Sequence, residues 1–350
     1  MNLLAGDLGG TKTFLAIYEN NNSLNKLYQR KYISSEWNGL ENMIISFYNE
    51  LPKSIEKPSY GCIGVAGRVI EGKSIMTNLP WEISEEKLCK SLNLKKLEIV
   101  NDFCVLIYGL PFFKKNQYIP IKESLNKELA KGMVAIIGAG TGLGIARGLI
   151  RDDEIIALPS EGGHKEFSPR SEKEWEIATW LKKDLNLNRL SIERIVSGTG
   201  LGHISRWRLT QSDVDKHPLQ EIASKWNYSH KNGPDLPALT GRAAQNGDIL
   251  MKEVMDIWLN AYGSVIGDLA LEELCQGGIW IAGGTASKNL EGLRSPNFLK
   301  SLENKGRFKK FVQNVPLTIL TDPEAGLFSA ACKARIMSKP NGTLRSIVKN

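Results

Sequence analysis

Short apolar runs, several of which end in glycine, alternate along the chain with longer stretches of helical hydrophobic spacing. The apolar runs predict strands at residues 27–32, 60–69, 96–102, 277–284 and 316–322, and two strands joined by a glycine turn at both 2–18 and 133–150. The helical spacing predicts helices at residues 41–51, 84–92, 103–110, 172–185 and 323–337, and a long helical region at about 238–275. Strands and helices that alternate in this way indicate an α/β protein.

The pattern of strand, glycine turn and strand occurs twice, with the two copies about 130 residues apart. A pattern that recurs once predicts two similar α/β halves, whereas a solenoid would repeat it many times. The length of 350 residues is also that expected of two domains.

The composition argues against a membrane protein, a secreted protein and a disulfide- or zinc-stabilised fold. A hydrophobic content of 42% and a charged content of 24% are ordinary for a soluble globular chain, and no apolar run approaches the ~18 residues of a membrane span. The N-terminus lacks the pattern of a signal peptide. The cysteines are odd in number and never in CxxC spacing, which argues against a disulfide framework or a zinc knuckle. We therefore expect a cytoplasmic protein without a membrane partner.

The net charge of +7 suggests nucleic-acid binding at first sight. However, the basic residues are dispersed, and the densest small group, residues 305–310, lies beside apolar residues. Proteins that bind nucleic acid gather positive charge on one face. We therefore expect a solvated, lysine-rich surface that helps to attract anionic ligands, and no nucleic-acid partner.

Three glycine-rich strand ends are candidate phosphate sites. "GDLGGTK" (6–12) and "GAGTGLG" (138–144) can form anion-binding concavities from successive backbone amides, and Gly283-Gly284 lies between a strand and a helix. Each turn by itself could be an ordinary turn, and neither hairpin turn matches a P-loop or a GxGxxG that leads into a helix. Together, in two similar halves, they favour a nucleotide site.

These turns resemble those of a known family. "DLGGTKT" (7–13), "GAGTGLG" and "GGIWIAGG" (277–284) resemble the sugar-kinase branch of the actin/hexokinase/Hsp70-type ATPase superfamily. Within it, "VNDF" (100–103) resembles the catalytic Asn-Asp of bacterial glucokinases, and "EGGH" (161–164) resembles their sugar-binding Glu-x-Gly-His. "TNLPW" (77–81) and "IERIVSGTGL" (192–201) also fit, so the resemblance runs from residue 2 to about 335.

The resemblance implies a two-lobed actin-like, ribonuclease H-like α/β fold, with two similar domains around an interdomain cleft. We expect a small domain at residues 1–112 plus 324–350 and a large domain at 113–323. The related ROK kinases carry a cysteine-rich zinc motif shortly after their Glu-x-Gly-His. Residues 165–200 contain no cysteine, so the resemblance is to the glucokinases proper.

The nucleotide implied by the resemblance is ATP with Mg²⁺. Asp7 is the predicted Mg²⁺ ligand, through water, although an Asx turn is an alternative role for it. Lys12 is a further candidate for neutralising the phosphates. The residues predicted to bind the nucleotide are Gly6, Asp7, Leu8, Gly9, Gly10, Thr11, Gly140, Thr141, Gly142, Gly283 and Gly284.

Asp102 is the predicted general base. It follows an apolar strand, so it is expected at the carboxyl end of a sheet, where ligands of open α/β folds bind. A carboxylate at that place can accept the proton of a sugar hydroxyl as phosphoryl transfer proceeds. The alternative is a helix cap, because Asn-Asp before an apolar helix is a good capping pair.

Further polar residues are implied as sugar ligands by the resemblance, since hydroxyls need both acceptors and donors. The predicted sugar-binding residues are Asn78, Asn101, Asp102, Glu161, His164 and Glu193. The other histidines are expected to be structural or on the surface. Cys104, close to Asp102, is expected to be a packing residue, and a redox role is its alternative.

The implied reaction is ATP-dependent phosphorylation of D-glucose at its 6-hydroxyl, the entry step of glycolysis, and the family suggests a homodimer. A kinase for mannose or glucosamine is the nearest alternative. A sugar-sensing regulator would carry a DNA-binding module before the first turn, and the first predicted strand begins at residue 2. A chaperone-like ATPase would lack "EGGH".

Overall fold

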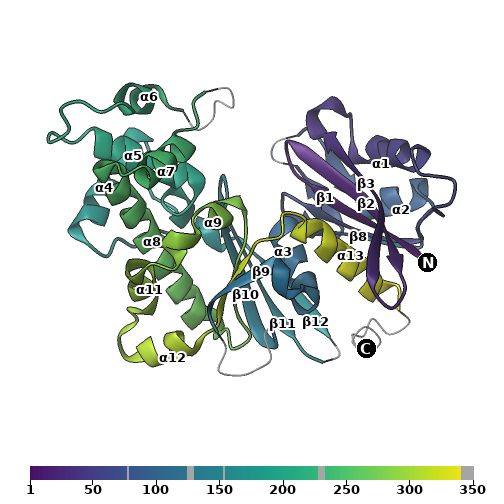
Figure 1. The fold of residues 1–350 in the computed structure, drawn as a ribbon. Helices are drawn as coiled ribbons and strands as arrows, with labels where there is room; N and C mark the ends of the chain where they lie inside the picture. The colour runs from purple at the N-terminus through teal and green to yellow at the C-terminus, as the bar shows by residue number, and fades with distance from the viewer. Residues whose placement is uncertain (77–78, 124–129, 153, 228–232, 340–350) are drawn as a thin grey trace.

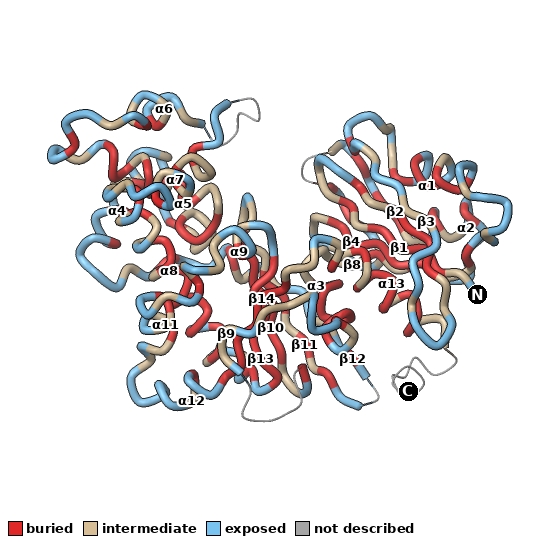
Figure 2. The backbone as a smooth tube through the Cα atoms, in the orientation of Figure 1, coloured by how far each residue is buried: buried red, intermediate tan, exposed pale blue. Residues whose placement is uncertain are grey.

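The molecule is built around two large twisted β-sheets, with helices between them and on their outer faces (Figure 1). The structure is a computed structural model of the 350-residue chain, and it describes all residues except 77–78, 124–129, 153, 228–232 and 340–350. In both sheets the central strands are buried, whereas the edge strands and the outer faces of the helices are more exposed (Figure 2). Among the helices that the described residues form, none is long and apolar enough to cross a membrane.

The first sheet has the strand order β3-β2-β1-β4-β8. Its strands are β1 (Asn2–Leu8), β2 (Lys12–Asn20), β3 (Leu24–Ile33), β4 (Tyr60–Val65) and β8 (Lys96–Asn101). The hairpin of β1 and β2 is antiparallel, whereas β1, β4 and β8 run parallel, so their carboxyl ends meet at one edge. A small sheet of β5 (Val69–Ile70), β6 (Lys73–Ile75) and β7 (Glu82–Ser84) follows β4 along the chain.

Helices cover both faces of the first sheet. The cluster that contains Leu4 and Leu8 also takes in residues of α1 (Leu40–Asn49) and α2 (Glu85–Ser91). On the opposite face, Leu3 and Ala5 pack with α13 (Ala325–Met337). Neighbouring residues of a strand point to opposite faces, so even-numbered residues of β1 face α1 and odd-numbered ones face α13.

The second sheet has the strand order β12-β11-β10-β13-β14-β9. Its strands are β9 (Tyr118–Lys122), β10 (Gly132–Ala139), β11 (Leu143–Ile150), β12 (Ile155–Ser160), β13 (Gly278–Ile281) and β14 (Leu317–Leu320). Again an antiparallel hairpin, β10 with β11, adjoins parallel strands, β13 and β14. The recurrence of this arrangement confirms the prediction of two similar α/β halves.

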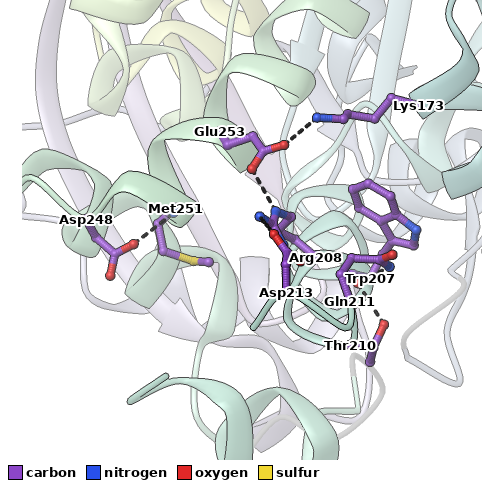
Figure 3. Close-up of polar contacts among 9 residues, drawn as sticks. All are labelled: Lys173, Trp207, Arg208, Thr210, Gln211, Asp213, Asp248, Met251 and Glu253. Carbon is purple, nitrogen blue, oxygen red and sulfur yellow. Dashed lines mark hydrogen bonds and ion pairs between the residues drawn. The ribbon is translucent and has the colours of Figure 1, made fainter. Parts of the chain in front are cut away.

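The outer face of the second sheet carries a large helical layer. Its helices are α4 (Glu172–Asp184), α5 (Gly198–Leu209), α6 (Gln220–Lys225), α7 (Leu236–Gln245), α8 (Ile249–Glu273), α9 (Gly284–Lys288), α10 (Leu290–Leu293), α11 (Pro296–Glu303) and α12 (Lys309–Asn314). A cluster of ion pairs centred on the buried Arg208 ties α4, α5 and α8 together. Glu253 of α8 accepts hydrogen bonds from Lys173 of α4 and Arg208 of α5, and Arg208 also binds Asp213 through two nitrogens (Figure 3).

The long helical region expected at 238–275 is two helices, not one. Gly247 has φ +98°, a left-handed conformation that interrupts α-helix geometry. Asp248 then caps α8 by accepting a hydrogen bond from the Met251 amide at 3.0 Å (Figure 3). The expected helix at 323–337 similarly begins at Ala325, after Pro323.

Two segments lie between the sheets (Figure 1). One is α3 (Asp102–Leu106) and the 3₁₀ helix that continues it (Ile107–Phe112), where the sequence predicted a single α-helix at 103–110. The other is α13, which packs on β1 and β4 of the first sheet. Residues of both segments share a core with Val134 and Ile136 of β10. The two sheets are therefore held together by α3 and α13.

Candidate active site

Asp7 and Asp102 line one cavity of about 290 Å³ between the sheets. Asp7 belongs to β1 and Asp102 follows β8, so both lie at the edge where the parallel strands of the first sheet end. The second sheet contributes the residues after β13 and β14. The lining residues are Asp7, Asp102, Phe103, Leu106, Ala282, Gly283, Gly284, Ser287, Leu320, Thr321, Asp322, Pro323, Ala325 and Gly326.

Burial changes the acid–base properties of both carboxyls. It raises the pKa of Asp7 to about 6. The pKa of Asp102 is also raised to about 6, mainly by burial, and the nearby charge of Asp7 adds to the effect. A hydrogen bond from the Phe103 amide to Asp102 Oδ1, at 2.9 Å, opposes this rise. At neutral pH Asp102 is thus ionised but basic enough to accept a proton.

The helix cap considered for the Asn-Asp pair is made by Asn101. Its Oδ1 accepts hydrogen bonds from the amides of Phe103 at 3.0 Å and Cys104 at 3.1 Å. Its Nδ2 donates to the Gly67 carbonyl at 3.2 Å. Asn101 therefore caps α3, while the Asp102 side chain lies in the cavity. The sugar contact predicted for Asn101 stays a prediction.

The first glycine turn is braced by a residue that sequence reasoning missed. Within the turn, the Gly9 amide donates to the Lys12 carbonyl at 3.0 Å. The buried Ser34 donates from its hydroxyl to the Gly9 carbonyl at 2.8 Å and from its amide to the Thr11 carbonyl at 3.0 Å. Thr11 itself remains exposed. Nothing in the local pattern around Ser34 signals this role, because the contact spans 25 residues.

Three neighbouring residues of β1 have different environments, although all were predicted to bind the nucleotide. The Leu8 side chain is fully buried in the core beneath α1. Gly6 faces the same way, since a Cβ there would lie 3.0 Å from Ile63 Cγ2. Asp7 points to the opposite face, toward α13 and the cavity. Of the three side-chain positions, only Asp7 faces the cavity, and Gly6 serves the packing of the sheet.

The second glycine turn rests on the start of α5. The Gly140 amide donates to the Gly142 carbonyl at 2.8 Å, and the Gly140 carbonyl accepts from the Gly198 amide at 2.7 Å. The Thr199 hydroxyl donates to the Thr141 carbonyl at 2.8 Å. These contacts hold residues 140–142 in one conformation and explain why "SGTGL" accompanies the turn.

Three of the residues predicted to bind the sugar, Glu161, His164 and Glu193, lie around Leu143 at the start of β11. The Leu143 amide donates to Glu193 Oε2 at 2.9 Å. The turn that carries Glu161 and His164 packs so closely on Leu143 that a Cβ at Gly163 would lie 2.3 Å from its carbonyl oxygen. Glu161 Oε2 and His164 Nε2 are 3.9 Å apart, and both side chains are exposed. Asn78 lies outside the described residues.

The third glycine-rich strand end, Gly283-Gly284 after β13, lines the cavity. Gly283 has φ +89°, so a side chain there would be strained, and nothing approaches the position of a Cβ at Gly284. Sequence reasoning missed two of its neighbours, Asp322 and Gly326. A Cβ at Gly326 would lie 2.9 Å from Asp7 Oδ2, so the Asp7 carboxylate rests on that glycine. The signal for Asp322 was present, because it follows an apolar strand just as Asp102 does.

Comparison with known proteins identifies the relatives of this chain. The family model described as glucokinase matches residues 4–337. The chain is 34% identical to a glucokinase of Trichormus variabilis, over 95% of this chain and 99% of the relative. It is also similar in structure to a glucokinase from an Antarctic psychrotroph (TM-score 0.80, 25% identity, 95% of this chain and 98% of the other).

A more distant structure has ligands bound. It is a ROK family glucokinase from Streptomyces griseus in complex with glucose and AMPPNP, with a TM-score of 0.59 and 17% identity. The match covers 96% of this chain and 99% of the other, and it supports the fold. Because the family model and the 34% identical relative both span nearly the whole chain, the chain belongs to the glucokinase family.

Proposed function

We propose that this chain transfers the γ-phosphoryl group of ATP to the 6-hydroxyl of D-glucose, with Asp102 as the general base. The observation that carries the proposal is the Asp102 carboxylate, which lies in a cavity shared by the ends of both sheets. Its pKa, raised to about 6 by burial, suits a base that works near neutral pH. Membership of the glucokinase family supports the reaction.

In the proposed reaction the Asp102 carboxylate takes the proton of the 6-hydroxyl. The hydroxyl oxygen forms its bond to the γ-phosphorus as the bond from that phosphorus to the bridging oxygen of ADP breaks. Asn101 holds the start of α3, and with it Asp102, through the cap hydrogen bonds. Closure around bound glucose would limit water, which otherwise competes with glucose as the acceptor.

The glycine ends are proposed to hold the nucleotide. The exposed turn at Gly10 and Thr11 and the turn at residues 140–142 would cradle phosphates, and Gly283-Gly284 would face the nucleoside. Asp7 fits a Mg²⁺ ligand, because magnesium prefers carboxylate oxygen and takes its remaining ligands from water and phosphates. When bound, Mg²⁺ would neutralise charge on the transferring phosphate.

Glucose is proposed to contact Asn101, Glu161, His164 and Glu193, with Asn78 as an additional ligand. Glu193 already accepts the Leu143 amide through one oxygen, which holds its carboxylate in place beside the second glycine turn. We also propose a cytoplasmic homodimer with a small domain at 1–112 plus 324–350 and a large domain at 113–323. The packing of α3 on β10, β11 and β12 and of α13 on β1 and β4 is compatible with both segments acting at the domain junction.

The proposal is tested with a coupled assay of purified protein, Mg-ATP and a panel of hexoses. We expect glucose to be the preferred substrate and Asp102→Asn to lower kcat about 10³-fold while glucose still binds, because only proton acceptance is lost. The exposed Asp215→Asn serves as a control and should leave kcat unchanged. Glucose binding without turnover in the wild type would instead favour a sugar-sensing protein, and faster turnover of mannose or glucosamine would reassign the substrate.

A further inference from the structure

The ring of Phe103, the residue after Asp102, packs directly against the backbone of two glycines, Gly138 and Gly144. A Cβ at Gly138 would lie 2.6 Å from Phe103 Cε1, and a Cβ at Gly144 would lie 2.1 Å from both Cδ2 and Cε2. Gly138 of β10 and Gly144 of β11 are directly paired in the antiparallel register. Real Cβ atoms do not approach other atoms this closely, so the ring occupies space that only a glycine pair leaves open.

This glycine pair adjoins the second glycine turn. Gly138 and Gly144 stand on either side of residues 139–143, and residues 140–142 are those proposed to cradle a phosphate. A Cβ at Gly138 would also lie 2.6 Å from the Ala282 carbonyl oxygen, so the same glycine approaches the end of β13. The Phe103 ring therefore lies next to both the second glycine turn, at residues 140–142, and the third glycine-rich strand end, at Gly283-Gly284.

Phe103 is also linked directly to the carboxylate of its neighbour. Its amide donates to Asp102 Oδ1 at 2.9 Å and to Asn101 Oδ1 at 3.0 Å. It lines the cavity together with Asp102. A shift of the Phe103 backbone would therefore move the Asp102 carboxylate, since the two are joined by one peptide bond and one hydrogen bond.

We propose that Phe103 is a positioning residue: its ring, seated on Gly138 and Gly144, sets the distance between the Asp102 carboxylate and the glycine turn at 140–142. The base comes from the first half of the chain and the turn from the second, and phosphoryl transfer needs both at the correct separation. A misplacement of about 1 Å can lower a rate about 100-fold. The inference rests on the proposed function of Asp102.

A neighbouring contact of the same kind provides the control. A Cβ at Gly148 of β11 would lie 2.5 Å from Ile107 Cγ2, so Ile107 is likewise seated on a glycine, one helical turn after Phe103. That contact also joins the segment 102–112 to the second sheet, but it is four residues farther from Asp102 and from the turn. A Cβ at Gly148 would also lie 2.8 Å from the Ile156 carbonyl oxygen, so Gly148→Ala reports the effect of disturbed packing alone.

The experiment is a double-mutant cycle with Phe103→Leu, Gly144→Ala and the combination of both, beside Gly148→Ala. Each variant is assayed for kcat, for the KM of glucose and for thermal stability. We expect Phe103→Leu and Gly144→Ala each to lower kcat about 10-fold or more, with the KM of glucose within about threefold of wild type. The double variant should be faster than the product of the two effects predicts, because leucine leaves room for the new Cβ.

Gly148→Ala should lower the melting temperature without this loss of kcat. The proposal is overturned if Phe103→Leu retains a kcat within twofold of wild type, or if Gly148→Ala lowers kcat as much as Gly144→Ala does. If Gly144→Ala does not fold, the comparison of Phe103→Leu with wild type still decides. A wild-type chain without kinase activity, or an Asp102→Asn variant at full activity, would instead refute the function on which the inference rests.

Discussion

Burial of Asp7 and Asp102 raises the pKa of both carboxyls, which suits them to acid–base chemistry but lowers the stability of the folded protein at neutral pH. Both carboxyls have a pKa raised to about 6, whereas an unfolded chain would ionise them near 3.8. At neutral pH the folded protein must therefore keep two buried negative charges close together. This cost is lowered when a cation or a protonated group is near, which is the situation that a site for Mg-ATP would create.

Asp7→Asn should make the ligand-free protein more stable at pH 7–8, by on the order of 1–3 kcal/mol, because it removes one buried charge. A raised folded-state pKa favours folding below the unfolded value, and this advantage is lost as pH rises through about 6. The difference between variant and wild type should therefore stay nearly constant from pH 8 to about pH 6.5 and shrink as the pH falls from about 6 toward 3.8. Thermal melts across this range are the measurement, and a difference independent of pH would contradict the assigned burial of Asp7.

At the scale of single elements, helix starts carry much of the site. α3 begins at Asp102 with Asn101 as its cap, α5 begins beside the turn at 140–142, and α13 begins beneath Asp7. In α13 the second residue is Gly326, although glycine in a helix costs about 1 kcal/mol relative to alanine. The close approach of the Asp7 carboxylate accounts for that cost.

Gly326→Ala should therefore lower activity at least 10-fold, since the new Cβ would lie 2.9 Å from Asp7 Oδ2 and displace the carboxylate. Gly241→Ala in α7 is the matched control, because nothing lies within 4 Å of its Cβ position. That variant should keep full activity and gain up to about 1 kcal/mol of stability. Equal activity of the two variants in the kinase assay would show that Gly326 does not position Asp7.

At the scale of the whole molecule, the proposed sugar ligands and the base come from different places. Glu161, His164 and Glu193 meet around Leu143, and none of them is among the described residues that line the cavity with Asp102. We expect a sugar bound by both sets to draw the first sheet toward the second. The helical segments between the sheets, α3 and α13, are where such a hinge motion would be accommodated.

Saturating glucose should therefore make the protein more compact in solution, which small-angle X-ray scattering would detect as a smaller radius of gyration. The compaction should persist in Asp102→Asn, provided that this variant still binds glucose. A hexose that the enzyme neither binds nor phosphorylates serves as the control. An unchanged radius of gyration at saturating glucose would mean that the described arrangement of the two sheets already fits the sugar.

The sequence by itself determined the elements and the repeated hairpins, because these depend on local hydrophobic periodicity and on glycines at strand ends. It also marked Asp7 and Asp102, since each acid is next to the end of an apolar strand that the chain pattern makes visible. The hydrophobic pattern at about 238–275 marked a helical region but not its division at Gly247. Motif resemblance, rather than periodicity, indicated Glu161, His164 and Glu193.

Only the tertiary structure decided which of these residues meet. The bond from Ser34 to Gly9 and the seat of Asp7 on Gly326 join residues far apart in the chain, and such pairings leave no local pattern. The Phe103 ring on the pair Gly138 and Gly144 depends on strand register, which is set when the sheet forms. The raised pKa values of Asp7 and Asp102 likewise arise from burial, which depends on how segments distant in the sequence pack around each carboxyl.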